Sequence, residues 1–225
     1  MKMPAPAGVD LAGGHLPVRK LAALIAALAL APAALAASAP VAAVRASNDR
    51  VRSALDRYFK AEGAAKAKAR NDARSAVGSL LDFEALAQAT MGKRWSELTA
   101  QQRTRYTAAL RGAMEANYLS KMERGQVDMS KVKNDIVGET KQGERTVVKT
   151  RVVAGNDTAG VDYVMEPRKG GWKAVDVITE DVSLVDTYKD QVNRLLPKKG
   201  IDGVIAALER AKKRIEEEQP ATAAK

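Results

Sequence analysis

The chain has 225 residues, 46% of them hydrophobic and 4% aromatic, which predicts a globular core built mainly from aliphatic side chains, and its net charge of +10 predicts anionic partners. It contains no cysteine, and its one histidine, His15, lies in a segment that we predict to be cleaved. These absences exclude a disulfide, a thiol nucleophile, a Ser-His-Asp triad and an imidazole zinc site from the remaining chain. Carboxylate, lysine or tyrosine chemistry, or no chemistry at all, stays open.

Residues 1–36 have the features of a secretory signal peptide. A basic pair at 19–20 precedes the apolar run at 21–31, and the Ala-Leu-Ala sequence at 34–36 fits a cleavage site. The apolar run is too short to span a bilayer comfortably. We therefore predict export and cleavage, followed by a flexible lead-in at 37–47.

Helical spacing of apolar residues begins after this lead-in. We predict a helix capped within Ser47-Asn48-Asp49, with Val51, Leu55 and Tyr58 on one face. The alanine-rich, basic stretch 62–76 has little apolar periodicity. It is therefore either a solvated helix or a loose connector.

Two further helices have sequence signals at their ends. Asp82 is the predicted N-cap of a short helix that ends at Gly92. Thr99 and Gln102 form a capping-box pattern ahead of a one-sided apolar stripe that reaches Tyr118. This stripe predicts a long helix.

From residue 132 the apolar period changes to two. Four β runs, at about 132–140, 144–154, 159–166 and 172–179, are separated by short turn sequences, which predicts a four-stranded antiparallel meander. One face of the second and third runs is apolar: Val148, Val152, Val161, Tyr163 and Met165. That face must be covered.

Helices after the sheet are candidates for the cover. Ser183 is a predicted cap for a helix that Pro197 stops, and a last helix leads into a charged tail, 216–225, that we expect to fray. The predicted fold class is α+β, with a curved four-stranded antiparallel sheet covered by helices from both ends of the chain. We predict that residues 48–215 form one domain.

Acidic residues in and after the last predicted strand raise the question of a carboxylate site. Asp176 lies in the middle of this strand, while Glu180 and Asp181 lie where it gives way to a helix, whose dipole favours acids near its N-terminus. No histidine or metal-type spacing accompanies them. We therefore favour a structural role and predict no metal.

Basic residues could indicate nucleic-acid binding. Lys66, Lys68, Arg70 and Arg74 form one cluster, but alanines and acids separate them, rather than the aromatic residues on which bases stack. A solvated surface, or docking onto an acidic protein, is favoured, and nucleic acid is not a predicted partner. From the apolar pattern alone we favour a filled core over a lipid cavity, although both have the same periodicity.

Three sequence blocks carry a resemblance to a known family. They are DFEALAQATMGKRWSELTAQQRTRYTAAL at 82–110, WKAVDVITEDVSLVDTYKDQ at 172–191 and KKGIDGVIAAL at 198–208. In order and spacing, the chain over about 50–210 resembles the MlaC family of phospholipid-binding proteins, also known as toluene-tolerance proteins. One departure is Asp181, which replaces a glycine usual before VSLV.

The resemblance implies a periplasmic, monomeric carrier that shuttles phospholipid between membranes and maintains the lipid asymmetry of the outer membrane. It implies that the protein is not an enzyme and needs no cofactor. It also implies docking to an inner-membrane ABC transporter complex with an MCE-domain ring, and to an outer-membrane lipoprotein–porin complex. The alternatives are a carrier for another apolar ligand, such as a hopanoid or sterol-like lipid, and an exported basic nucleic-acid-binding protein.

In a carrier of this kind the acyl chains occupy an apolar cavity between sheet and helices. The residues that we expect to line it, called the expected wall residues below, are Leu110, Met114, Tyr118, Val148, Val152, Val161, Tyr163, Met165, Val175, Val177, Leu184, Val185 and Tyr188.

Overall fold

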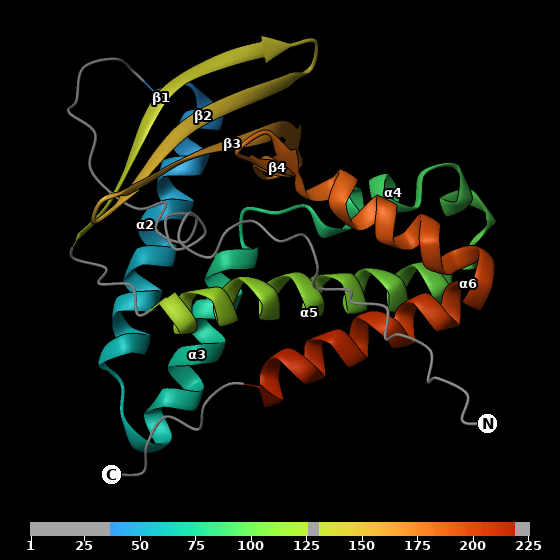
Figure 1. Ribbon diagram of the computed structural model, residues 1–225. Helices are drawn as coiled ribbons and strands as arrows, with labels where there is room; N and C mark the ends of the chain where they lie inside the picture. Colours follow the sequence, from blue (N-terminus) through green and yellow to red (C-terminus); the bar gives the residue numbers. More distant parts are fainter. Residues whose placement is uncertain (1–36, 126–130, 219–225) are drawn as a thin grey trace.

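Helices precede and follow a single antiparallel sheet, as Figure 1 shows for the computed structural model. The structure describes residues 37–125 and 131–218. The predicted signal peptide, 1–36, lies outside the described residues. In chain order the elements are α2 (Ala39–Lys60), α3 (Gly63–Gly78), α4 (Phe83–Met91), the 3₁₀ helix η2 (Gly92–Glu97), α5 (Ala100–Gly125), β1 (Val132–Gln142), β2 (Arg145–Ala154), β3 (Asp157–Arg168), β4 (Gly171–Thr179), β5 (Val182–Ser183) and α6 (Leu184–Glu217).

Helix α2 begins well before its expected cap, so the predicted flexible lead-in at 37–47 is wrong. Ser38 is the N-cap, and its Oγ accepts a hydrogen bond from the backbone N–H of Val41 at 3.5 Å. Ser47 and Asn48, which we expected to cap the helix, are buried in its middle. Tertiary packing thus overrides the preference of these short polar residues for helix ends.

Several other predicted helix ends are confirmed. Asp82 Oδ1 accepts a hydrogen bond from Ala85 N at 3.0 Å. In the capping box, Thr99 N donates to Gln102 Oε1 at 3.0 Å and Gln102 N donates to Thr99 Oγ1 at 3.2 Å. The undecided stretch 62–76 lies almost entirely in helix α3.

The sheet has five strands in the order β1-β2-β3-β4-β5, so the predicted count of four is wrong. The fifth strand has only two residues and pairs antiparallel with β4. Glu180 and Asp181 form the tight turn between them, with φ values of 46° and 64°. The left-handed backbone at Asp181 explains why glycine suits this position and why aspartate is one of the few residues that tolerate it.

Helix α6 contains a break that lies later than predicted. Ser183 Oγ accepts a hydrogen bond from Asp186 N at 3.0 Å, which confirms the cap. Pro197 does not stop the helix, because the non-helical residue is Gly200, with φ 62° and ψ −178°. Proline removes only its own N–H, whereas glycine adopts positive φ without a steric penalty. Residues 216–217 of the predicted frayed tail are helical, and 219–225 lie outside the described residues.

The sheet is covered on its inner face mainly by α2, and its strands curve over that helix (Figure 1). The first half of α2 packs on Val148 and Met165, and its second half packs on Val132, Val152 and Val161. Helix α6 meets the sheet mainly at β4 and β5, and it packs chiefly on α5 and α4. Helices from both ends of the chain thus contact the sheet, as expected, but α2 provides most of the cover.

None of the described helices is long and apolar enough to cross a membrane.

Candidate functional site

Three expected wall residues belong to the apolar interior between α4, α5 and α6, which we call the helical cluster. They are Leu110, Met114 and Tyr188, and each is buried. Leu184 and Val185, at the start of α6, are half-buried at the edge of this cluster.

Most of the other expected wall residues lie on the inner face of the sheet. Tyr163 occupies its middle, where its register partners are Val148 on β2 and Val177 on β4. Side chains that pair in register point to the same face, so these three residues share one surface. Val152, Val161 and Met165 are buried on the same face, and Tyr118 of α5 packs against the group that contains Val152. The structure thus brings together residues from β2, β3, β4 and α5.

Val175 is placed differently from its neighbour Val177. A β-bulge interrupts the β3–β4 register between Val164 and Met165. Because a bulge changes which face the following side chains take, Val175 packs with Val147 and Val164 on the outer face. From the alternation of a regular strand we expected Val175 and Val177 to lie on the same face of the sheet.

Five expected wall residues keep part of their surface exposed. They are Tyr118, Tyr163, Val177, Leu184 and Val185. They come from α5, β3, β4 and the start of α6. This half-buried apolar set, called the apolar margin below, includes residues that border the inner sheet face and residues that border the helical cluster.

The tyrosines of this region are uncharged at neutral pH. Burial raises the pKa of Tyr163 well above its usual range. Burial also raises the pKa of Tyr118, and the nearby Tyr163 adds to the effect. Both phenols therefore present a neutral surface with a hydroxyl group.

Asp176, within β4, and Glu180, in the turn after it, have structural hydrogen-bond partners, which supports the structural interpretation. Asp176 Oδ1 accepts hydrogen bonds from Val177 N at 2.8 Å and Val185 N at 3.1 Å, while Oδ2 accepts one from Ser183 at 2.6 Å. Glu180 Oε1 accepts a hydrogen bond from Gly160 N at 2.8 Å. These carboxylates hold the turn and the start of α6 in place.

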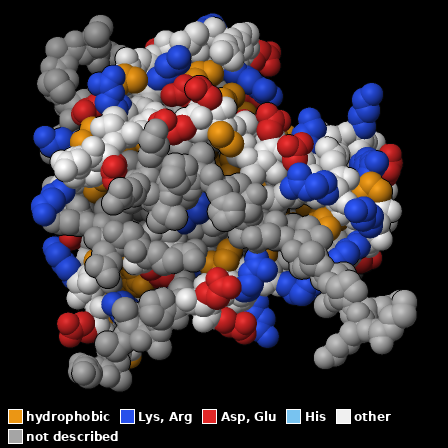
Figure 2. Space-filling model, viewed as in Figure 1, with side chains coloured by type: hydrophobic (Ala, Val, Ile, Leu, Met, Phe, Trp, Pro, Cys, Tyr) orange, Lys and Arg blue, Asp and Glu red, His pale blue; other side chains and the backbone are white. Residues whose placement is uncertain are grey.

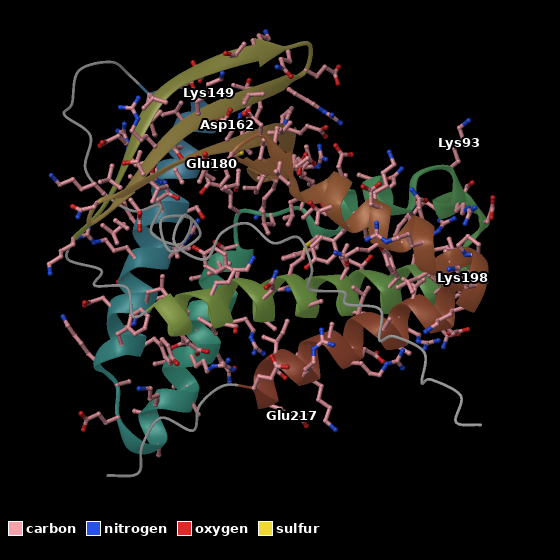
Figure 3. The ribbon with its side chains drawn as sticks, viewed as in Figure 1. Lys93, Lys149, Asp162, Glu180, Lys198 and Glu217 are labelled. Carbon is pink, nitrogen blue, oxygen red and sulfur yellow. The ribbon has the colours of Figure 1, made fainter. Side chains whose placement is uncertain are left out.

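Asp162 lies on the outer face of the sheet, in register with Lys149 (Figure 3). Burial raises the pKa of Asp162, and Asp181 adds to this increase while Lys149 opposes it. Within 37–125 and 131–218, no group of three or more His, Cys, Asp or Glu side chains is placed to hold a metal ion.

Much of the basic charge of α3 is paired within the molecule. Arg70 Nε lies 2.8 Å from Glu123 of α5, and Arg74 Nη2 lies 2.6 Å from Glu216 of α6. On the face drawn in Figure 2, basic and acidic side chains are interspersed. The partly buried ion pairs support a helix-bridging role for Arg70 and Arg74 rather than a nucleic-acid surface.

Residues of α2 are missing from the expected wall. Val44, Val51 and Leu55 are buried against the inner sheet face or its border. Their spacings of seven and four residues are helical. The assignment of 37–47 to a lead-in hid the first half of this signal.

Comparison with known proteins gives the same picture of the fold. A sequence model of the MlaC protein family matches residues 45–210. The chain is also similar to the solved structure of a phospholipid-binding protein from Ralstonia solanacearum in complex with a phospholipid. That likeness has a TM-score of 0.66 at 20% sequence identity, and it covers 79% of this chain and 98% of the other. The family match spans most of the chain, and the protein therefore belongs to the MlaC family.

Proposed function

We propose that this protein binds a phospholipid, holds its acyl chains between the sheet and the helices, and carries it through the periplasm without catalysing a reaction. The observation that carries this proposal is the family match over 45–210. The shared fold with a protein solved together with a phospholipid supports it.

The apolar margin suits the energetics of such a ligand. Each methylene transferred out of water contributes about 0.8 kcal/mol, so a sixteen-carbon chain carries about 12 kcal/mol of transfer free energy. A carrier must nearly match this value with apolar surface of its own. Tyr163 and Val177 on the sheet, and Leu184 and Val185 on α6, offer such surface without a charged group. We propose that these residues and Tyr118 line a cavity for the chains.

The remaining parts of the proposal rest on what the family resemblance implies and, for residues 1–36, on the signal-peptide pattern. Residues 1–36 direct export, and one lipid-binding domain spans 48–215, extended at its start by the first turns of α2. The partners are an inner-membrane transporter complex with an MCE-domain ring and an outer-membrane lipoprotein–porin complex. The carrier is a monomer and helps to maintain the lipid asymmetry of the outer membrane.

Lipid extraction tests the binding step directly. The full-length chain, purified without detergent, is extracted with organic solvent, and the extract is analysed by mass spectrometry. We expect about one phospholipid for each chain. Recovery of no lipid would contradict the proposal. Recovery of a hopanoid or sterol-like species would reassign the ligand. Co-purified nucleic acid whose binding depends steeply on salt would favour a nucleic-acid-binding protein instead.

A further inference from the structure

Asn134 is a buried polar residue on the inner face of the sheet. Its side chain is 5% exposed, and neither Oδ1 nor Nδ2 has a hydrogen-bond partner among the described residues. It lies on β1, in register with Val152 of β2, and Val132 is the preceding residue on the same face. Both valines are buried in the cluster that includes Tyr163 and Val177 at its border. The amide is therefore enclosed in apolar surroundings on the face that we propose for the ligand.

An amide in this position destabilises the unliganded protein. Its donor and acceptor lose their hydrogen bonds to water on folding and gain none in return. Thr150, on the same face of β2, shows the usual solution, because its Oγ1 donates to the backbone oxygen of Val161 at 2.7 Å. Asn134 has no such partner in the described part of the chain, so both polar atoms of its amide are left for a group outside the described residues.

We propose that Asn134 donates a hydrogen bond from Nδ2 to an acyl ester carbonyl of the bound phospholipid. This inference rests on the proposed function and adds a polar specificity contact to it. The ester carbonyls are the uncharged acceptors that adjoin the acyl chains, so they enter apolar surroundings at a smaller desolvation cost than the phosphate. An amide N–H is a matching donor, and it carries no charge that would need a counterion.

Ester-linked and ether-linked phospholipids with the same headgroup and chain length distinguish this contact, because an ether linkage lacks the carbonyl. Affinities are measured with the full-length protein by displacement of a fluorescent phospholipid. We expect the protein to prefer the diester about three- to tenfold, the factor that one net hydrogen bond supplies. Asn134→Leu, which has nearly the same shape, should bind both lipids with equal affinity.

Thr150→Val is the matched control, because it removes a buried hydroxyl that is already satisfied on the same face. It should keep the preference for the diester. Asn134→Leu should also raise the melting temperature of the lipid-free protein by about 3 °C, since it removes an unpaired buried amide. If the leucine variant does not fold, Asn134→Val undergoes the same measurement.

The outcomes separate this inference from the proposed function. Equal affinity of the unmodified protein for both lipids, or a preference that survives in Asn134→Leu or Asn134→Val, would overturn the ester contact alone. Failure of the unmodified protein to bind either lipid would overturn the proposed function. Loss of the preference in Asn134→Leu with its retention in Thr150→Val would support the contact.

Discussion

The helical cluster and the inner sheet face are both apolar, but they close to different degrees. In the helical cluster Leu86, Leu110 and Ile205 are fully buried. Two buried hydroxyls in it are paired with each other: those of Thr90 and Tyr106 lie 2.8 Å apart, and burial raises the pKa of Tyr106 to about 12. Gln191 of α6 is also buried, and its Oε1 has no hydrogen-bond partner among the described residues. The cluster has the character of a packed core.

The inner sheet face departs from this pattern. Tyr163 and Val177 keep part of their surface, and Asn134 has no internal hydrogen-bond partner among the described residues. Helix α5 makes its main contacts with α6 rather than with the strands, which leaves the cover of this face mainly to α2 (Figure 1). The difference teaches that equal hydrophobicity does not mean equal packing. Substitutions in the first region should mainly change stability, and those in the second should mainly change binding.

The largest expected effect belongs to the helical cluster. Leu86→Ala should lower the free energy of unfolding by about 2–5 kcal/mol, because it removes buried methyl groups and leaves a cavity. Urea denaturation measures the loss. Leu98→Ala, at the half-buried edge of the same cluster, is the control and should lose less. A loss from Leu86→Ala as small as that of the control would contradict the description of this region as a packed core.

A charge on the inner sheet face should affect binding more than folding. Val177→Asp should lower phospholipid recovery about tenfold or more, since a carboxylate would have to be desolvated beside the acyl chains. Mass spectrometry of extracts measures the recovery, and near-ultraviolet circular dichroism reports the folded fraction.

Val137→Asp provides the comparison for this variant, because Val137 is a strand residue that is 50% exposed. Its lipid recovery should equal that of the unmodified protein. Folded Val177→Asp protein with unchanged lipid would rule out Val177 as part of the lipid-binding surface.

The smallest expected effect concerns acid stability, at the start of α4. Partial burial opposes ionisation of Asp82, but hydrogen bonds from Ala85 N and from Arg168, at 2.6 Å, outweigh it and lower the pKa of Asp82. Because its pKa is lowered, the ionised carboxylate stabilises the folded state at pH values above its pKa in the unfolded state, about 4. This stabilisation is lost as the pH falls through its pKa in the folded state. Stability should therefore fall between about pH 5 and pH 3.

Asp82→Asn keeps the cap but has no carboxylate, so it should lose less stability over this range than the unmodified protein does. Urea denaturation at a series of pH values measures the difference. Asp72→Asn, which removes one partner of an exposed ion pair with Lys68, is the control and should follow the unmodified protein closely. Identical acid curves for Asp82→Asn and the unmodified protein would show that this carboxylate contributes nothing.

Predictions that depend on short-range contacts agree with the structure. The Asp82 cap and the Thr99–Gln102 capping box each join residues three positions apart, so both hydrogen-bonding partners can be recognised within one short stretch of sequence. The strand positions agree because alternation is a local property of the backbone. The break in α6 was predicted at Pro197 but lies at Gly200. Proline and glycine both interrupt helices, and which of the two does so here depends on where the part of α6 after the break packs.

The wall prediction was harder, because a cavity wall and a core have the same pattern. Tyr163 and Val177 lie on one face, as alternation predicts, whereas the bulge near Val164 moves Val175 to the other face. The unpaired amide of Asn134 had no sequence signal either, since an asparagine in a strand pattern is usually exposed.

The sequence by itself determined the absence of thiol and imidazole chemistry beyond residue 36, the α+β class, and most helix and strand positions, because these depend on composition and on contacts between near neighbours. Only the tertiary structure decided that α2 covers the sheet, that β5 adds a fifth strand, and that Tyr163 and Val177 remain half-buried. The physical reason is that each element has several possible apolar partners. The choice among them minimises the free energy of the whole chain rather than that of any one segment.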